Sequence, residues 1–344
     1  MVYVVVIMGQ IKLLIVEDSL FMQKILQDIL QSDQQLSVIG TARDGEEALS
    51  KVASLHPDVV TMDIEMPRMD GLTAVKRIME KNPLPVVMVS ALTQREAQLT
   101  LKALEYGAVD YVPKPSGSIS LNMNVVRDEL ISKIKTAAFA NIRQIRTKIN
   151  ETWDVPTKFS EKIISIAAST GGPPAISQVL STLPGNVPPI LIVQHMPKVV
   201  TKLFAEDLNA KCRFKVKEAE EGDSIQNNLA LVAPGGFHMI VTKGNKVSLT
   251  LDPPVNYVRP SADVMMTSMA QEYGQKNVGV VLTGMGADGA KGIKAIKEKG
   301  GATIAQDEKT SVVYGMPNSA FQTGCVDVVA PLELISKEIM KACD

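Results

Sequence analysis

Short apolar runs alternate with amphipathic stretches along the first third of the chain. The runs that predict buried strands are Ile11–Val16, Leu36–Gly40, Val59–Met62, Pro85–Val89 and Val109–Val112. Between them, stretches such as Phe21–Leu30 and Leu72–Met79 have their apolar residues at the spacing of amphipathic helices. This alternation predicts an α/β domain with a doubly wound parallel sheet, whose functional residues lie at the carboxyl ends of the strands.

A second α/β pattern begins at Ile163 and continues to the end of the chain. The predicted strands are Ile163–Ala167, Ile190–Gln194, Val278–Thr283 and Ala302–Ala305, and the predicted helices are Pro173–Leu183, Val199–Asn209, Asp288–Lys299 and Leu332–Ala342. A β-rich insert with turns at Pro234–Gly236 and Lys243–Asn245 lies between them. We therefore predict a second doubly wound α/β domain.

The region between the two patterns predicts a linker. Residues 124–150 have a basic helical pattern, and residues 150–161 are polar and contain Pro156. We expect a first domain over residues 1–123, a helical linker over 124–160 and a second domain over 161–344. The basic residues of the linker are interleaved with apolar ones, which favours a helix packed on its own domain over a nucleic-acid-binding surface.

Composition and charge exclude several classes of protein. The formal net charge is -1, so no global field attracts the chain to nucleic acid or to acidic lipid. Its three cysteines are widely spaced without a CxxC pair, which argues against a disulfide framework or a structural zinc site and favours the cytoplasm. The apolar segment Val2–Met8 is too short to insert into a membrane and lacks the features of a signal peptide. The sequence does not decide between Met1 and Met8 as the natural start.

Polar and charged residues follow the predicted strands of the first domain. Glu17 and Asp18 follow the first strand and Asp63 the third, while Ser90 and Lys114 follow the fourth and fifth. Three carboxylates at one sheet edge repel one another, and a hard divalent cation such as Mg²⁺ relieves that repulsion. One carboxylate can then accept a phosphoryl group while Lys114 neutralises charge and Ser90 donates a hydrogen bond. Taken singly, these residues also fit helix caps or loop positions.

These positions resemble a response-regulator receiver domain. The motifs that carry the resemblance are Val16–Ser19, Met62–Gly71, Val89–Ala91 and Asp110–Pro115. The resemblance implies a flavodoxin-like (βα)5 fold with Asp63 as the phosphorylated residue. The Mg²⁺ ligands that it implies are Glu17, Asp18, Asp63 and the backbone carbonyl of Glu65. The residues that it implies for sensing the phosphate are Ser90, Lys114 and Tyr111, the last as an aromatic switch.

Ser169 lies in a strand–turn–helix pattern in the second domain. The turn Ala168–Gly172 follows a predicted strand, and Pro173 opens the next helix. A serine at a helix N-terminus lies where backbone N–H groups can stabilise an oxyanion, as in a nucleophile elbow, although the G-x-S-x-G spelling is absent. The same layout suits a glycine-rich phosphate cradle, and the turn alone does not decide between the two.

Two further residues favour the nucleophile. His195 ends the next strand and Asp288 follows a third one, so both are expected at the same sheet edge as Ser169. A serine nucleophile needs an adjacent base, and the base needs an orienting acid. His238 is the alternative base, whereas His56 precedes a strand of the first domain and lies at the wrong edge.

The second domain resembles the catalytic domain of the CheB methylesterases. The matching stretches are Ala168–Gly172, Gln194–Pro197, Arg259–Asp263, Thr283–Gly289 and Gly315–Pro317. The resemblance implies that Ser169 is the nucleophile, His195 the general base and Asp288 its orienting acid. It also implies that Thr170 and the backbone at Met285 support the oxyanion. The chain has Ala168 and Asn318 where this family usually has glycine and arginine.

The resemblance implies a function for the whole chain. The family hydrolyses glutamate γ-methyl esters and deamidates glutamines on methyl-accepting chemotaxis receptors, and its esterase reaction needs no cofactor. A chemotaxis histidine kinase would be the phosphodonor, so the fusion predicts a hydrolase activated by phosphorylation in chemotactic adaptation. Arg259 is a candidate contact for acidic residues of the receptor or an ordinary surface cation. The alternative is a non-enzymatic regulator that binds a partner through its Ser-Thr-Gly-Gly turn, which would not need His195 or Asp288.

Overall fold

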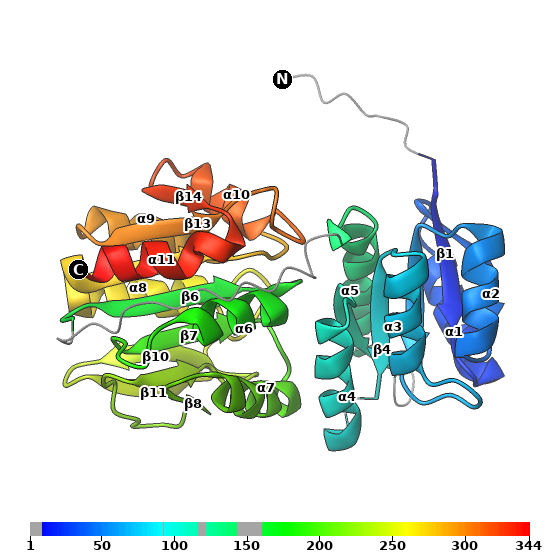
Figure 1. Cartoon of the computed structure of the whole chain (residues 1–344), viewed down its shortest axis with the longest axis horizontal. Coiled ribbons are helices and arrows are strands. Elements are labelled where there is room, and N and C mark those ends of the chain that lie inside the picture. Colours follow the sequence, from blue (N-terminus) through cyan, green and yellow to red (C-terminus); the bar gives the residue numbers. More distant parts are fainter. Residues whose placement is uncertain (1–8, 92, 116–121, 143–159) are drawn as a thin grey trace. The chain divides into compact units, whose positions relative to one another are not determined.

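The computed structural model describes residues 9–91, 93–115, 122–142 and 160–344, and the chain divides into two compact units between Ile142 and Arg143 (Figure 1). The apolar segment Val2–Met8 and the polar stretch around Pro156 lie outside the described residues. Among the described helices, none combines the length and the apolar character that crossing a membrane requires. Each unit is an α/β domain, as the alternating pattern predicts.

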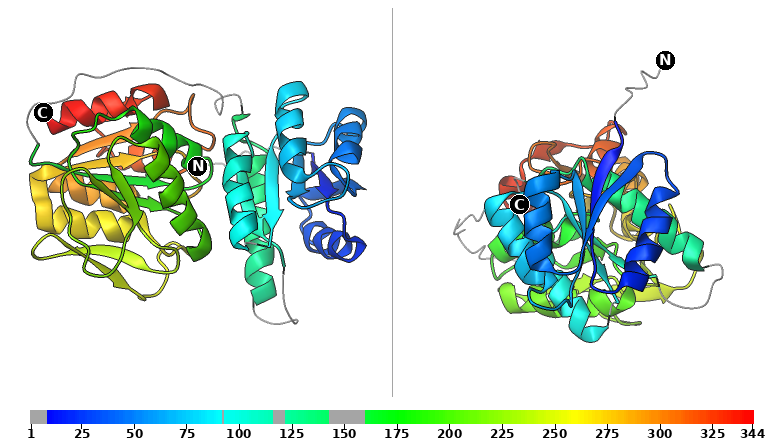
Figure 2. Two further views of the ribbon diagram at one scale, coloured as in Figure 1. Left: turned by 60° about the horizontal axis from the view of Figure 1, so that its bottom comes forward. Right: turned by 90° about the vertical axis from the view of Figure 1, so that its right-hand side faces the viewer.

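The first unit is a five-stranded parallel sheet in the order β2-β1-β3-β4-β5. Its strands are β1 (Ile11–Val16), β2 (Leu36–Ala42), β3 (Val59–Asp63), β4 (Val86–Ser90) and β5 (Asp110–Pro113). Its helices are α1 (Leu20–Gln31), α2 (Gly45–Leu55), α3 (Gly71–Lys81), α4 (Gln94–Glu105) and α5 (Asn122–Ala137). Helices α1 and α5 contact each other, and α3 contacts both α2 and α4, so helices cover both faces of the sheet (Figures 1 and 2). This arrangement confirms the predicted fold class.

Helix α5 corrects the predicted linker. It packs against β3, β4 and β5, and its Leu130, Ile134 and Ala137 side chains are completely buried. The basic pattern that we assigned to a linker from residue 124 therefore includes the last helix of the first unit. Most of the remaining linker, residues 143–159, lies outside the described residues.

The second unit contains a seven-stranded parallel sheet in the order β14-β13-β12-β6-β7-β9-β8. The strands are β6 (Ile163–Ala168), β7 (Ile190–Gln194), β8 (Lys215–Glu218), β9 (Leu229–Val232), β12 (Asn277–Val281), β13 (Ala302–Gln306) and β14 (Val328–Ala330). The helices are α6 (Gly172–Thr182), α7 (Lys198–Lys211), α8 (Ala262–Tyr273), α9 (Ala290–Glu298), α10 (Met316–Phe321) and α11 (Leu332–Cys343), with a short 3-10 turn at Gly274–Lys276. Strand β6 lies between β12 and β7, so the strand order reverses beside it, and open α/β sheets bind their ligands at the carboxyl ends of strands next to such a reversal.

The predicted β-rich insert contains four strands, β8 to β11. Strands β8 and β9 extend the main parallel sheet, and only β10 (His238–Thr242) and β11 (Lys246–Thr250) form an antiparallel hairpin. The hairpin packs against helix α8, which the sequence pattern did not predict. Met265, Met266 and Met269 of α8 are completely buried in the core beneath it.

Helices α8 and α9 approach each other closely at Gly292. A Cβ atom placed on Gly292 would lie 2.5 Å from the Cβ atom of Met266, which is near the backbone and cannot move aside easily. Only glycine fits this contact without displacing one helix. The contact fixes the start of α9 against the start of α8, and residues at both starts belong to the site described below.

We expect Gly292→Ala to destabilise the second unit by about 1–2 kcal/mol. Overpacking of a core contact costs about 1–3 kcal/mol and outweighs the gain of up to ~1 kcal/mol in helix propensity. Urea unfolding of the full chain, followed by circular dichroism, measures the change. Lys291→Ala on the exposed side of the same helix is the matched control and should stay within about 0.5 kcal/mol of wild type. A Gly292→Ala variant as stable as its control would contradict the close contact.

Candidate functional site

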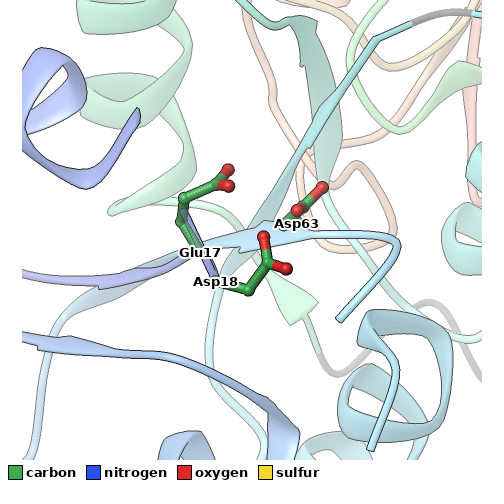
Figure 3. Close-up of side chains that lie close together, drawn as sticks. All are labelled: Glu17, Asp18 and Asp63. Atoms are coloured by element: carbon green, nitrogen blue, oxygen red, sulfur yellow. The ribbon is translucent and has the colours of Figure 1, made fainter. Parts of the chain in front are cut away.

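The predicted acidic residues of the first unit lie together. Carboxylate oxygens of Glu17, Asp18 and Asp63 all lie within 4.8 Å of one another, at the carboxyl ends of β1 and β3 (Figure 3). The Lys114 ammonium joins two of them, with Nζ 2.8 Å from Oδ2 of Asp63 and 3.0 Å from Oε2 of Glu17. Four of the predicted residues are thus in mutual reach.

Burial makes the ionised forms of these carboxylates unfavourable. Burial, with the neighbouring charge of Asp63, raises the pKa of Glu17 to about 7. Burial also raises the pKa of Asp63 above its ordinary value. Burial alone would lower the pKa of Lys114, but its hydrogen bonds to Asp63 and Glu17 outweigh it and raise that pKa. The Lys114 ammonium contacts two of the three carboxylates, and the oxygen-only donor set fits a hard divalent cation such as Mg²⁺.

Two other predicted receiver residues, Ser90 and Glu65, have side chains that contact residues outside the acidic cluster. Ser90 Oγ donates a 2.9 Å hydrogen bond to Oε2 of Glu96, which also accepts from the backbone N–H of Ala91. Glu96 was missed by the sequence interpretation because it lies in the first turn of α4, where a glutamate is common. The Glu65 side chain is paired with Arg95, 3.4 Å away, and the ligand predicted from this residue is its backbone carbonyl.

Tyr111 is an aromatic residue enclosed in the first unit. It is 3% exposed, and its hydroxyl has no hydrogen-bond partner within the described part of the chain. The Lys133 ammonium lies 5.1 Å from the centre of its ring, and burial raises the pKa of Tyr111 well above its ordinary value. An unsatisfied buried hydroxyl is costly, which makes this side chain a candidate for a change of position.

In the second unit, Ser169 lies in the tight turn between β6 and α6. Gly171 has a positive φ of 73°, which favours glycine, and the Val312 side chain fills the space beside it. The Ser169 backbone N–H donates a 3.0 Å hydrogen bond to the carbonyl of Thr283, in the loop after β12. A Cβ atom on Gly284 would lie 2.8 Å from the Cβ atom of Ser169, so that loop packs directly against the serine.

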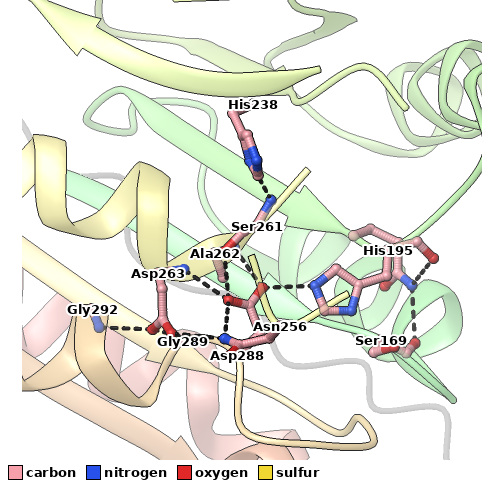
Figure 4. Close-up of polar contacts among 11 residues, drawn as sticks. Ser169, His195, His238, Asn256, Ser261, Ala262, Asp263, Asp288, Gly289 and Gly292 are labelled. Carbon is pink, nitrogen blue, oxygen red and sulfur yellow. Dashed lines mark hydrogen bonds and ion pairs between the residues drawn. The ribbon is translucent and has the colours of Figure 1, made fainter. Parts of the chain in front are cut away.

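His195 and Asp288 form a direct pair. His195 follows β7, and its Nε2 lies 2.8 Å from Oδ2 of Asp288, which follows β12 (Figure 4). The two carboxylate oxygens of Asp288 also accept from Ser261 Oγ at 2.6 Å and from the backbone N–H of Ala262 at 2.6 Å. Burial would raise the pKa of Asp288, but the contacts with His195, Ser261 and Ala262 outweigh it and hold that pKa below its ordinary value. These contacts favour the ionised form of Asp288, and one of them joins it to the imidazole of His195.

Ser169 and His195 lie on neighbouring strand ends of the same sheet edge. Figure 4 shows the His195 ring between Asp288 and Ser169. Because Nε2 faces Asp288, Nδ1 is the ring nitrogen left for a proton from the serine. Within the described contacts, Ser169 Oγ has no hydrogen bond to this ring, and such bonds are often completed only when a substrate binds. The predicted triad residues thus share one edge, with the acid–base pair already formed.

His238 has a structural position and not that of the base. It is completely buried, its Nδ1 accepts from the backbone N–H of Ser261 at 3.2 Å, and its Nε2 lies 3.2 Å from the carbonyl of Pro253. Both ring nitrogens are therefore engaged in holding the backbone. The alternative base that the sequence left open is not in reach of Asp288 within the contacts that the structure describes.

The sequence interpretation missed the partners that hold Asp288. Ser261, Ala262 and Asp263 start helix α8, and all three donate to Asp288, with the Asp263 N–H at 3.1 Å. Asp263 in turn accepts from the backbone N–H groups of Gly289 and Gly292 at 2.9 Å each, at the start of α9. A serine and an aspartate at these positions have the pattern of an ordinary helix start, so the sequence did not reveal that each helix start holds a carboxylate from the other.

Arg259, which we considered as a contact for acidic receptor residues or as an ordinary surface cation, binds the backbone of its own loop. Its Nη1 donates to the carbonyls of Leu251 and Asp252 at 2.9 Å each, so this group holds the backbone of its own loop. The residues predicted to support the oxyanion lie at the expected edge. Thr170 is buried, with its carbonyl accepting from Thr283 Oγ1 at 3.0 Å, and Met285 is 39% exposed in the loop that follows β12. Their role stays a prediction.

Comparison with known proteins places this geometry in a family. Residues 164–339 match the family model for CheB methylesterase, and residues 13–125 match that of the response regulator receiver domain. A protein-glutamate methylesterase/protein-glutamine glutaminase of Pyrococcus abyssi is 51% identical, covering 97% of this chain and 94% of that protein. The corresponding protein of Symbiobacterium thermophilum is 45% identical over 96% of this chain and 97% of its own length.

A solved structure agrees with these relatives. The crystal structure of the Thermotoga maritima CheB methylesterase catalytic domain is 40% identical and superimposes with a TM-score of 0.51, over 53% of this chain and 98% of that domain. The similarity extends over both units and includes the strand ends that carry the acidic cluster and the His195–Asp288 pair. The chain therefore belongs to the CheB methylesterase family, with a response-regulator receiver domain in front of the methylesterase domain.

Proposed function

We propose that this protein hydrolyses glutamate γ-methyl esters on methyl-accepting chemotaxis receptors, deamidates glutamines there, and is activated by phosphorylation of Asp63. The observation that carries the proposal is the 2.8 Å contact between Asp288 and His195 at the strand end beside Ser169. A loop that only bound a partner would need neither residue. The names of the relatives, which include both the methylesterase and the glutaminase, support the same chemistry.

The hydrolysis follows from these positions. Ser169 Oγ attacks the γ-carbonyl carbon while Nδ1 of His195 takes its proton, and Asp288 stabilises the imidazolium that forms. The tetrahedral intermediate collapses, methanol leaves with the proton from His195, and an ester to Ser169 remains. Water, deprotonated by His195, then attacks this ester, and His195 returns the proton to Ser169 Oγ as the ester bond breaks and glutamate is released. With glutamine the leaving group is ammonia, and neither reaction calls for a cofactor.

The oxyanion of each tetrahedral intermediate needs hydrogen-bond donors. We assign this role to the backbone at Thr170 and Met285, because one lies at the start of the helix that follows Ser169 and the other in the loop packed against it. Gly284 brings that loop next to Ser169, where a larger residue would collide with the serine.

The receiver domain supplies the switch. Asp63 would accept a phosphoryl group from a chemotaxis histidine kinase, and Glu17, Asp18, Asp63 and the carbonyl of Glu65 would hold Mg²⁺, which supplies positive charge when bound. Lys114 already contacts Asp63 and would transfer its hydrogen bonds to the phosphoryl oxygens. Ser90 would exchange its bond to Glu96 for one to the phosphoryl group, and Tyr111 would move in response. We place the protein in the cytoplasm, which its three free thiols favour.

Ser169→Ala should abolish methanol release and leave the fold intact. Loss of a serine nucleophile from such a triad lowers kcat by roughly 10⁴- to 10⁶-fold. The measurement is release of labelled methanol from methylated chemoreceptor membranes. Ser181→Ala, at the other end of α6, is the matched control and should keep wild-type activity, since among the described residues its hydroxyl bonds only to the carbonyl of Gln178. Equal release from Ser169→Ala and wild type would move the nucleophile elsewhere.

Asp288→Asn should lower kcat by roughly 10³- to 10⁴-fold, because the amide no longer holds the imidazole in its working orientation. Asp263→Asn is the control: Asp263 contacts helix N–H groups, with no bond to His195, so its kcat should fall much less. Comparable losses for the two variants would contradict the assignment of Asp288 as the orienting acid.

Asp288→Asn should also reduce the free energy of unfolding in a pH-dependent manner. The depressed pKa of Asp288 means that its ionised form stabilises the fold above the unfolded-state pKa, and that this stabilisation disappears as the pH falls through the folded-state pKa. We expect a deficit of about 2–3 kcal/mol at neutral pH that shrinks in acid. Urea unfolding of the variant and the wild type at pH 7 and at acid pH measures this difference in the free energy of unfolding. A difference that grows in acid would contradict a lowered pKa of Asp288.

Asp63→Asn should remove stimulation by a phosphodonor and keep the basal esterase rate. Acetyl phosphate with Mg²⁺ should raise methanol release for wild type only, and a chelator should cancel this stimulation while leaving the basal rate unchanged. Asp58→Asn is the matched control, because Asp58 precedes β3 and its carboxylate caps the backbone of Lys12. Stimulation that survives in Asp63→Asn would place the phosphorylated residue elsewhere.

A further inference from the structure

The loop from Leu251 to Pro260 carries a tight turn with an aromatic residue at its tip. Val255 and Val258 form two backbone hydrogen bonds with each other, of 3.1 and 3.0 Å. Between them, Asn256 and Tyr257 have φ angles of 52° and 65°, so both are left-handed, as in a type I′ turn. Such turns favour asparagine at the first position and glycine at the second. Tyr257 therefore occupies a position that glycine would fill at lower conformational cost.

The turn is held in place from both sides. Arg259 binds the carbonyls of Leu251 and Asp252, and the buried His238 lies 3.2 Å from the carbonyl of Pro253. The side chain of Asn256 points inward, with Nδ2 3.1 Å from Oδ2 of Asp263 and 3.5 Å from Oδ1 of Asp288 (Figure 4). The first tip residue thus touches the acid that orients His195. Tyr257 is adjacent in the chain, with its Cα about 3.8 Å from that of Asn256.

The Tyr257 side chain is directed entirely into solvent. It is 102% exposed, and within the described residues it has no hydrogen bond or ring contact. Single exposed aromatic residues are common on protein surfaces. Tyr257 combines exposure with a backbone conformation that its side chain makes costly, so its own unit gains no stability from the ring. Strain that persists next to an active site is often connected with function.

We propose that Tyr257 contacts the substrate: its ring packs against the receptor segment that carries the methyl ester and holds that segment beside Ser169 and His195. The inference rests on the proposed esterase function and assigns part of its substrate recognition. The ring would cover residues that flank the reacting glutamate, with no contact to the reacting atoms. A tyrosine suits this task because it offers a large contact surface with only two side-chain torsions to fix, and tyrosines are enriched among residues that dominate binding.

The test uses three variants of the full chain, all activated with acetyl phosphate and Mg²⁺. Tyr257→Gly and Tyr257→Asn remove the ring and accept a left-handed backbone readily, whereas Tyr257→Phe keeps the ring and is the matched conservative variant. Three quantities are measured for each: kcat/KM for methanol release from methylated receptor membranes, the thermal unfolding midpoint, and the rate at which a small fluorophosphonate reagent labels Ser169.

For the glycine and asparagine variants we expect kcat/KM on receptor membranes to fall about tenfold, the loss typical of a residue that matters in recognition. Their unfolding midpoints should be unchanged or higher, since the backbone strain is relieved. Fluorophosphonate labelling should proceed at the wild-type rate, because the reagent is too small to need the ring. The phenylalanine variant should restore the receptor rate.

Three results would overturn the inference. Receptor kcat/KM equal to wild type in the glycine variant would mean that the ring does not contact the substrate. A fluorophosphonate rate that falls in parallel would mean that Tyr257 supports Ser169 and His195 instead, and a lowered midpoint would mean that it supports the fold. A wild type that releases no methanol would remove the proposed function itself, and this is distinct from an active wild type whose variants equal it.

Discussion

The carboxylate of Asp288 is the contact on which the catalytic unit depends. It joins three elements that are distant in the sequence: the end of β7 through His195, the start of α8 through Ser261 and Ala262, and its own loop after β12. Buried carboxylates are costly unless their hydrogen bonds are satisfied, and here the donors include the N–H groups of a helix start. The same donors lower the pKa of Asp288 and fix its orientation. The same hydrogen bonds to Asp288 therefore stabilise the fold of this unit and fix the carboxylate that contacts His195.

The carboxylates of the receiver domain have surroundings opposite to those of Asp288. Asp288 is surrounded by donors and its pKa is lowered, whereas Glu17 and Asp63 face each other with a single lysine between them and their pKa values are raised. A carboxylate whose oxygens all accept hydrogen bonds has a fixed position and can fix the side chain that it contacts. An under-compensated cluster is suited to take up positive charge and to change when a phosphoryl group arrives. The carboxylate pKa values are therefore raised in the receiver domain, where a charge is to be taken up, and lowered at Asp288, where the carboxylate holds fixed partners.

Much of this organisation could be predicted from the sequence because parallel strands bring their carboxyl ends to one edge. That rule placed Glu17, Asp63 and Lys114 together, and it placed His195 and Asp288 together, although their distances were unknown. Helix α8 was missed because its methionine-rich core face has a weak amphipathic pattern. The pairing of β8 and β9 with the main sheet was not predicted because sheet membership depends on contacts distant in the sequence. The partners of Asp288 were missed for the same reason: a helix start shows which residues cap it, not which distant carboxylate they bind.

The helix start that holds Asp288 also fixes the turn that precedes α8. Asn256 contacts Asp263 and Asp288 together, so the turn that precedes α8 cannot shift without disturbing the acid behind His195. A loop fixed in this way loses little conformational freedom when a partner binds, because that freedom was already lost on folding. Recognition by an exposed side chain on such a loop adds affinity without the ordering cost of a flexible one. Under the proposed function, the network that holds Asp288 and His195 would therefore also give the surrounding surface the rigidity to position a protein substrate.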